Sequence, residues 1–99
     1  MGRRKLLKSD ERRAVFGVPT DDDGLIRHYT LSLSDRLEIQ TRRRPPNQLG
    51  FAVQLCLMRY PGRTLMSGES LPLATLGFIA RQLDIEPHEF NLYARRQPT

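Results

Sequence analysis

The sequence predicts an all-α fold, a small orthogonal bundle of five or six short helices that contains a helix-turn-helix-like unit. Apolar residues recur at helical spacing in several short segments, and capping residues, glycines or prolines separate these segments. No strand alternation continues for more than a few residues. A chain of 99 residues suits one domain, so we treat residues 1–99 as a single helical domain that includes a basic arm at residues 1–8.

Two short helices are expected directly after the arm. Ser9 is a capping residue followed by two acidic residues, which predicts a first helix that ends at about Phe16, before Gly17 and Pro19. Thr20 is expected to cap a second helix, whose apolar face holds Leu25, Ile26 and Tyr29. Three consecutive helical positions point in different directions, so the first-turn aspartates 21–23 favour a helix-dipole role over a metal or catalytic cluster.

A third helix is expected to begin at Ser32, with Asp35 completing a capping box and apolar positions at Leu33, Leu37 and Ile39. It is predicted to run into arginines 42–44, where Pro45 and Pro46 prevent its continuation. Arginines at the carboxyl end of a helix are stabilised by the helix dipole without any ligand. Three adjacent guanidinium groups beside a rigid Pro-Pro corner equally form a phosphate clamp, and the sequence leaves both interpretations open.

The fourth helix, which Asn47 is expected to cap, is apolar around most of its circumference, and this pattern indicates the central buried helix. Cys56 lies inside its apolar run and is expected to be a small buried hydrophobe; as the only cysteine it cannot form an internal disulfide. His28 and His88 have no neighbouring cysteine, so the sequence predicts neither a metal site nor a cofactor.

The last two helices have the spacing of a helix-turn-helix over residues 75–96. The fifth helix is expected to begin at Pro72, and the final helix near Pro87. Phe90 and Tyr93 are expected to anchor the second helix of this unit against the first, which packs through Ile79, Ala80 and Leu83. One feature departs from the usual pattern: the turn position that often holds glycine is Asp84, whose short polar side chain tolerates a left-handed conformation at some cost.

The charge balance points to nucleic acid. The net charge is +5, and of sixteen basic residues fourteen are arginine, which forms paired hydrogen bonds to phosphate and to guanine edges. A GC-rich genome would enrich arginine as well, so composition alone leaves both explanations open. No apolar run is long enough to span a membrane and the amino terminus lacks a secretory pattern, so we expect a cytoplasmic protein with no membrane partner.

Three regions are candidate contacts with double-stranded DNA: the basic arm, the segment around the Pro-Pro corner, and the outer side of the last helix. The arm could equally be a solvated tail, and Glu86 and Glu89 on the last helix oppose attraction to phosphate. The candidate contact residues are Arg3, Arg4, Lys5, Arg42, Arg43, Arg44, Asn47, His88, Asn91, Arg95 and Arg96.

The strings LIRHYTLS (25–32), LGFAVQLCLMRYPGR (49–63) and FIARQLDIEPHEFNLYARR (78–96) resemble the amino-terminal region of the Tn3 family of bacterial replicative transposases. The resemblance implies a region that helps to recognise the terminal inverted repeats of a transposon, with transposon-end DNA and another transposase chain as the expected partners. It also implies that the catalytic Asp-Asp-Glu set lies far beyond these residues. No catalytic residue is carried over, and we expect no enzyme activity.

Two other classes of function remain as alternatives. A protein-interaction module for transposase assembly would expose an apolar strip, which we expect on the Leu92 side of the last helix. An enzyme would need a nucleophile, a base and an orienting residue in register, and no such set is present in the sequence. Ser67 and Ser70 are more simply loop and cap residues.

Overall fold

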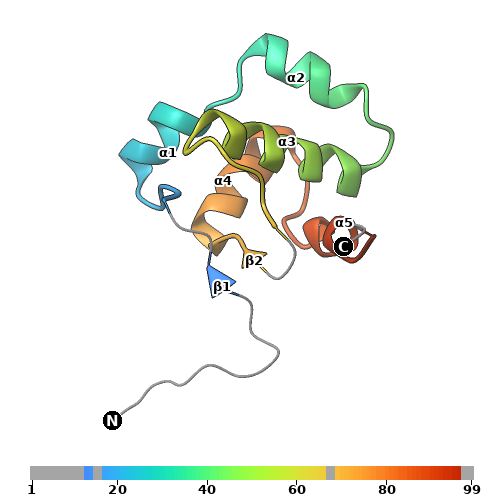
Figure 1. The fold of residues 1–99 in the computed structure, drawn as a ribbon. Helices are drawn as coiled ribbons and strands as arrows, with labels where there is room; N and C mark the ends of the chain where they lie inside the picture. Colours follow the sequence, from blue (N-terminus) through green and yellow to red (C-terminus); the bar gives the residue numbers. More distant parts are fainter. Residues whose placement is uncertain (1–12, 15–16, 67–68, 97–99) are drawn as a thin grey trace.

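The computed structural model describes residues 13–14, 17–66 and 69–96, with the backbone alone for residues 13–14 and 94–96. The described part contains five helices and one short pair of strands (Figure 1). In chain order the elements are β1 (Arg13–Ala14), α1 (Asp22–Tyr29), α2 (Leu33–Gln40), α3 (Pro45–Arg59), β2 (Glu69–Ser70), α4 (Leu73–Leu83) and α5 (Glu89–Arg96).

Helix α3 is the centre of the molecule, as its apolar circumference predicts. It packs against all four other helices, most extensively against α5, and Figure 1 shows α2 along one side of it and α4 along the other. The predicted all-α bundle is therefore confirmed. The buried core is drawn from every helix and comprises Leu25, Tyr29, Leu31, Ile39, Leu49, Ala52, Val53, Cys56, Leu57, Leu71, Leu76, Ile79, Ala80 and Phe90.

The two strands form a minimal parallel ladder, with Arg13 opposite Glu69 and Ala14 opposite Ser70. The first helix expected over residues 9–16 is therefore wrong at residues 13–14, and its remaining positions lie outside the described residues. The strand depends on pairing with a segment more than fifty positions away along the chain, which local capping signals cannot reveal.

Helix α1 is capped by Asp21, whose carboxylate accepts a hydrogen bond from the Gly24 amide at 3.3 Å. The cap predicted at Thr20 is wrong by one residue. Leu25 and Tyr29 are four positions apart and are both buried, whereas Ile26 is 58% exposed because the next residue along a helix is rotated by about 100°.

Helix α2 carries the predicted capping box: Ser32 Oγ accepts from the Asp35 amide at 3.0 Å, and Asp35 accepts from the Ser32 amide at 2.9 Å. The helix ends at Gln40, with Thr41 as its C-cap, so residues 42–44 lie in the connection to α3 rather than on the helix as predicted. Because α2 contacts the core through Ile39, its outer side faces away from the core and leaves Leu33 and Leu37 exposed.

Helix α3 begins with Pro45 and Pro46, and Arg44 is its N-cap residue. Asn47 is therefore the third residue of the helix, and its predicted role as the cap is wrong. Proline suits this position because its φ angle already fits a helix and because the first amide groups of a helix need no intrahelical acceptor.

An ion pair fastens α2 to the carboxyl end of α3. Arg59 donates from Nη1 to Asp35 Oδ2 at 2.9 Å and from Nη2 to Oδ1 at 3.0 Å. The hydrogen bond from Arg59 lowers the pKa of Asp35 from 3.8 to about 2, and the hydrogen bonds with Ser32 act in the same direction. Asp35 is therefore both a helix cap and the point that holds α2 on α3.

This pair predicts an acid-dependent stability. The folded-state pKa of Asp35 is lower than its unfolded value, so its contribution is complete above pH 3.8 and is lost as the pH falls towards about 2. Thermal unfolding between pH 5 and pH 2 should show a smaller loss of stability in Asp35→Asn than in the wild type. Glu38→Gln, on the same helix, controls for removing one negative charge; equal acid sensitivity of the wild type and Asp35→Asn would contradict the assignment.

Candidate nucleic-acid interface

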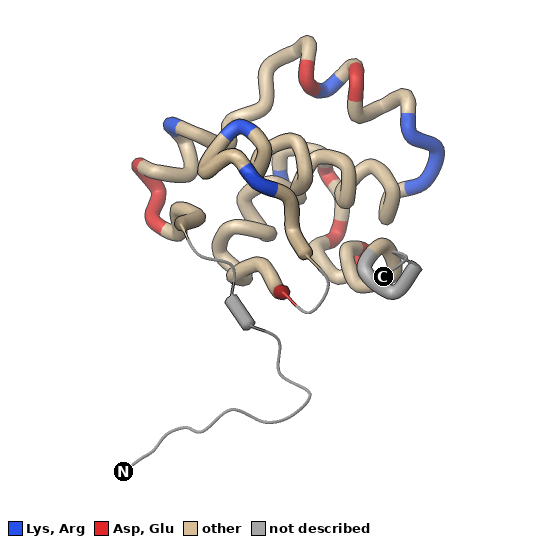
Figure 2. The backbone as a smooth tube through the Cα atoms, in the orientation of Figure 1, with Lys and Arg blue, Asp and Glu red and all other residues tan. Residues whose placement is uncertain are grey.

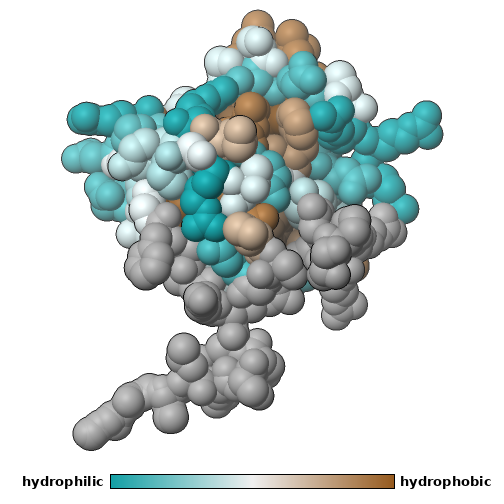
Figure 3. All heavy atoms as spheres, viewed as in Figure 1, coloured by the Kyte–Doolittle hydropathy of each residue, from teal (hydrophilic) through white to brown (hydrophobic). Residues whose placement is uncertain are grey.

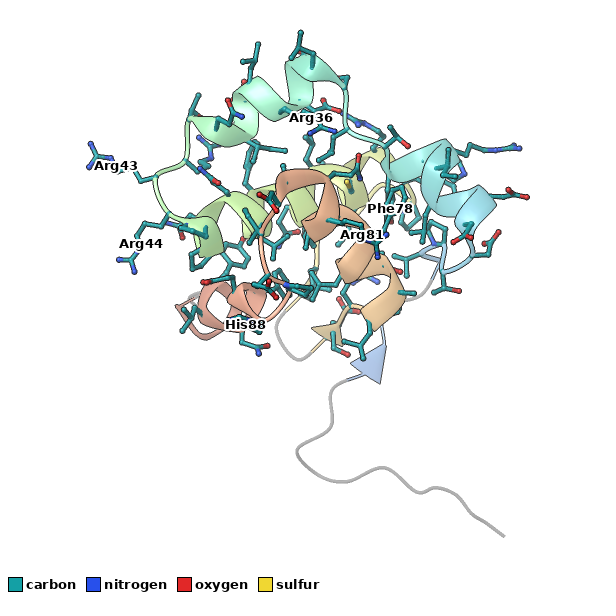
Figure 4. The ribbon with its side chains drawn as sticks, turned by 180° about the vertical axis from the view of Figure 1, so that it is seen from behind. Arg36, Arg43, Arg44, Phe78, Arg81 and His88 are labelled. Atoms are coloured by element: carbon teal, nitrogen blue, oxygen red, sulfur yellow. The ribbon has the colours of Figure 1, made fainter. Side chains whose placement is uncertain are left out.

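The connection between α2 and α3, residues 41–44, presents two adjacent arginines to solvent. We call it the arginine corner. Arg43 and Arg44 are both exposed, and their side chains form no hydrogen bond or ion pair with any described residue. Figure 4 shows both side chains projecting away from the helices at one edge of the molecule. Two guanidinium groups at this edge are therefore available to bind an anionic partner.

The backbone of the arginine corner is held by the start of α3. Arg44 is extended, with φ −121° and ψ 152°, because the ring of a following proline excludes the helical conformation. Its carbonyl oxygen accepts the first hydrogen bond of the helix, from the Gln48 amide at 2.8 Å. The positive end of the helix dipole lies at the same place, and it adds to the attraction for anions.

Arg42 differs from its two neighbours. It is half-buried, and its guanidinium carbon lies 3.9 Å from the centroid of the Phe51 ring, in the geometry of a cation–π contact. Its backbone amide donates to Ile39 at 3.0 Å, and its carbonyl oxygen accepts from Gln48 Nε2 at 2.9 Å. Of the three predicted clamp arginines, Arg43 and Arg44 are thus the two whose side chains form no hydrogen bond or ion pair with a described residue.

Other arginines serve the fold. Arg59 pairs with Asp35, Arg63 pairs with Glu69, and Arg36 donates from Nη1 to the Gln82 carbonyl oxygen at 2.7 Å. Arg27 and Arg81 are exposed on α1 and α4, apart from the arginine corner along the chain and in space (Figures 2 and 4). Basic residues are therefore distributed over the molecule, and the described residues contain one exposed arginine pair adjacent in sequence.

Helix α5 lies on α3 at the same edge of the molecule as the arginine corner (Figures 1 and 4). Its Tyr93 ring covers Gly50 so closely that a Cβ added at Gly50 would lie 2.2 Å from Tyr93 Cδ1. Phe90 is buried, and its ring centroid is 5.6 Å from that of Tyr93. The expected packing of Tyr93 against the first helix of a helix-turn-helix is thus corrected: α5 packs mainly against α3.

The structure exposes part of the predicted contact set on α5. His88, at the start of α5, and Asn91 are exposed, whereas Asn47 is half-buried on α3. The side chains of Arg95 and Arg96 lie outside the described residues, as do Arg3, Arg4 and Lys5 in full. Within the described part, the arginine corner and the outer side of α5 are the predicted contact regions that share one edge.

The turn between α4 and α5 is acidic. Asp84 ends α4 in the left-handed conformation, with φ 58° and ψ 42°, as the sequence predicts for this position. Asp84 and Glu86 are exposed and Glu89 is half-buried, so three carboxylates surround the turn (Figure 2). This charge opposes the close approach of a phosphate backbone to the turn.

The described residues offer little for chemistry. They contain no group of three or more metal-ligating side chains. Burial raises the pKa of the Cys56 thiol to about 12, so this cysteine is the buried hydrophobe that was predicted. None of the described helices is long and apolar enough to cross a membrane.

An exposed apolar strip was expected on the Leu92 side of the last helix. The structure also exposes apolar side chains on α2. Leu33 is 73% exposed and Leu37 is 57% exposed, and with Ser34, Glu38 and Thr41 they line a shallow hollow. Figure 3 shows apolar atoms at the outer edge of the molecule where α2 lies. Leu92 is itself 43% exposed.

Sequence reasoning missed the residues that hold the site in place. Phe51 and Gln48 contact Arg42 in the arginine corner. Gly50 has no side chain, which allows α5 to pack closely on α3. A glycine inside an otherwise apolar helix is a signal of close approach by a neighbour, and it could have identified Gly50. The contact between Arg42 and Phe51 has no comparable signal, because it depends on how the chain turns between two helices.

Comparison with known proteins finds one matching family and several similar transposases. Residues 6–99 match the family described as "Domain of unknown function (DUF4158)". The chain is 41% identical over 99 residues to the transposase for transposon Tn501 of Pseudomonas aeruginosa, and 40% identical over 100 residues to that for transposon Tn21 of Escherichia coli. It is 35% identical over 96 residues to the transposase for transposon Tn1546 of Enterococcus faecium.

These alignments cover 97–100% of this chain and 10% of each relative, so the chain spans about a tenth of the length of the curated relatives it matches. No solved structure matches the chain.

Proposed function

Since this chain belongs to the DUF4158 family and corresponds to the amino-terminal region of Tn3-family transposases, we propose that it is a DNA-binding module that acts in transposition. Its partner is the duplex at the transposon end, with the terminal inverted repeat as the recognised sequence. It acts without catalysis and without a cofactor, in the cytoplasm.

The observation that carries this proposal is the arginine corner. Arg43 and Arg44 are exposed, form no ion pair with a carboxylate of the described residues, and lie at the positive end of the α3 dipole. Phosphate contacts supply a large share of protein–DNA affinity, and arginine matches phosphate geometry with paired hydrogen bonds. The corner supplies affinity and orientation rather than base recognition.

Base recognition is assigned to the outer side of α5. His88, which precedes α5, and Asn91 on α5 are exposed, and α5 packs over Gly50, in the part of α3 that follows the corner. Asparagine can form paired hydrogen bonds with adenine in the major groove. A helix-turn-helix mode that inserts the α4–α5 turn is less well supported, because that turn is acidic and α5 packs mainly against α3. We therefore propose that the duplex approaches from the α2–α3 edge.

A second candidate function is a protein-interaction module for transposase assembly. The exposed Leu33 and Leu37 on α2 favour it, because exposed leucines on adjacent turns of one helix suit contact with another chain. This function predicts self-association without DNA, which sedimentation velocity over a range of protein concentrations measures directly.

A salt titration tests the DNA-binding proposal. Binding of the chain to a transposon-end duplex, and to a scrambled duplex of equal length and composition, is measured by fluorescence anisotropy between about 50 and 200 mM salt. We expect tighter binding to the transposon end. We also expect the logarithm of affinity to fall linearly with the logarithm of salt, with a slope of about −0.9 for each phosphate contacted.

Equal affinity for the two duplexes would reject sequence-directed recognition. The absence of a salt dependence would reject the arginine corner as a phosphate contact. Self-association without measurable DNA binding would favour the second candidate function.

A further inference from the structure

We infer that Arg42 is the positioning residue of the arginine corner, and that its stacking on Phe51 keeps Arg43 and Arg44 directed at the DNA. This inference rests on the proposed function. It divides three adjacent arginines, which look equivalent in the sequence, into one that supports the fold of the corner and two that contact phosphate.

Three contacts fix Arg42 to the body of the molecule. Its guanidinium carbon lies 3.9 Å from the centroid of the Phe51 ring, its amide donates to Ile39 at 3.0 Å, and its carbonyl oxygen accepts from Gln48 at 2.9 Å. Both ends of the residue and its side chain are therefore engaged. Phe51 and Gln48 belong to α3, so Arg42 joins the end of α2 to the first turns of the next helix.

Arg43 and Arg44 have the opposite pattern. Their side chains contact none of the described residues through a hydrogen bond or ion pair. Arg42 on one side and Pro45 on the other hold the backbone between them, because proline keeps the preceding residue extended. The two side chains therefore project from a backbone segment that is held at both ends. Figure 4 shows them on the same side of the corner.

Arg42 is half-buried with its guanidinium group over the Phe51 ring, and its Nη1 donates to Thr41 Oγ1 at 3.2 Å, whereas Arg43 and Arg44 are exposed. If Arg42 left Phe51 to contact the DNA, the side-chain contact that joins the corner to α3 would be lost. Charge counting distinguishes the two roles, because each phosphate contact contributes about one unit to the salt dependence of binding and a positioning residue contributes none.

The test compares Arg42→Met, Arg43→Gln and Arg44→Gln in the full chain bound to the transposon-end duplex. Arg43→Gln and Arg44→Gln should each reduce the slope of log affinity against log salt by about one. Arg42→Met should weaken binding by roughly three- to tenfold, the cost of ordering a loosened segment on binding, and should leave the slope unchanged.

Phe51 supplies a second, charge-neutral variant. Phe51→Leu removes the ring and should weaken binding to the same extent as Arg42→Met, again with an unchanged slope. Phe51→Tyr keeps the aromatic face and should restore wild-type affinity. Circular dichroism and thermal unfolding identify any variant that fails to fold. If Phe51→Leu fails to fold, Arg42→Met alone decides the question.

The possible results separate the inference from the function on which it rests. If Arg42→Met reduces the slope by about one, Arg42 contacts phosphate and the inference is overturned. Wild-type affinity of both Arg42→Met and Phe51→Leu would overturn it as well. If Arg43→Gln and Arg44→Gln change neither the affinity nor the slope, the proposed DNA contact itself is wrong.

Discussion

Replacing Arg43 and Arg44 together by glutamine is expected to weaken binding of the chain to a transposon-end duplex by roughly a hundredfold at moderate salt. A hydrogen bond to a charged group contributes about 1.5–3 kcal/mol, so each lost guanidinium–phosphate contact costs about tenfold or more. Both residues are exposed and their side chains form no hydrogen bond or ion pair with a described residue, so the fold should be unaffected. Anisotropy titrations of the wild type and the double variant measure the effect.

The matched control is the double variant Arg27→Gln and Arg81→Gln. It removes the same number of charges from exposed arginines on α1 and α4, helices that lie away from the connection between α2 and α3 (Figure 1). We expect it to weaken binding far less than the corner variant. A similar loss of affinity in both double variants would mean that overall charge, rather than the corner, attracts the DNA.

Replacing Gly50 by alanine is expected to destabilise the fold by about 1–3 kcal/mol, the usual cost of overpacking a core. The added methyl group would lie 2.2–2.4 Å from three ring carbons of Tyr93, so the ring or the whole of α5 must move. In a domain of this size the melting temperature should fall by about 4–8 °C for each kcal/mol. Because α5 would be displaced, DNA affinity should fall with it.

Two further variants control this experiment. Gly77→Ala changes a helical glycine on α4 where the nearest atom to the new Cβ is Arg81 Nη2 at 4.0 Å, and it should be neutral or stabilising because alanine favours helix. Adding Tyr93→Ala to Gly50→Ala should relieve the clash, although it also removes a ring. Equal stability of Gly50→Ala and Gly77→Ala would show that α5 does not pack on Gly50 as described.

Local signals predicted much of the helical framework. Three features lie where the sequence predicted them: the Ser32–Asp35 capping box, the apolar circumference of α3 and the left-handed Asp84. Each depends on the hydrogen-bonding groups or the shape of nearby side chains. Boundaries were less predictable at Thr20 and Asn47, because another residue one or three positions away fulfilled the capping or starting role.

The remainder depended on contacts between distant segments. Periodicity treated Leu37 and Ile39 alike as apolar positions, but only contact with α3 determines which of them is buried. The same limit applies to the candidate site. Composition indicated an arginine-rich surface, whereas the division between free Arg43 and engaged Arg42 follows from the position of Phe51 across the corner.

Tyr93 packs on Gly50 and Arg42 packs on Phe51, so both proposed contact regions are held by consecutive residues of one helix. The spacing between them is consequently set before any duplex arrives, because both contacts are made to α3. Because of this preorganisation, association loses mainly translational, rotational and side-chain entropy. The free-energy cost of rearranging the backbone is small.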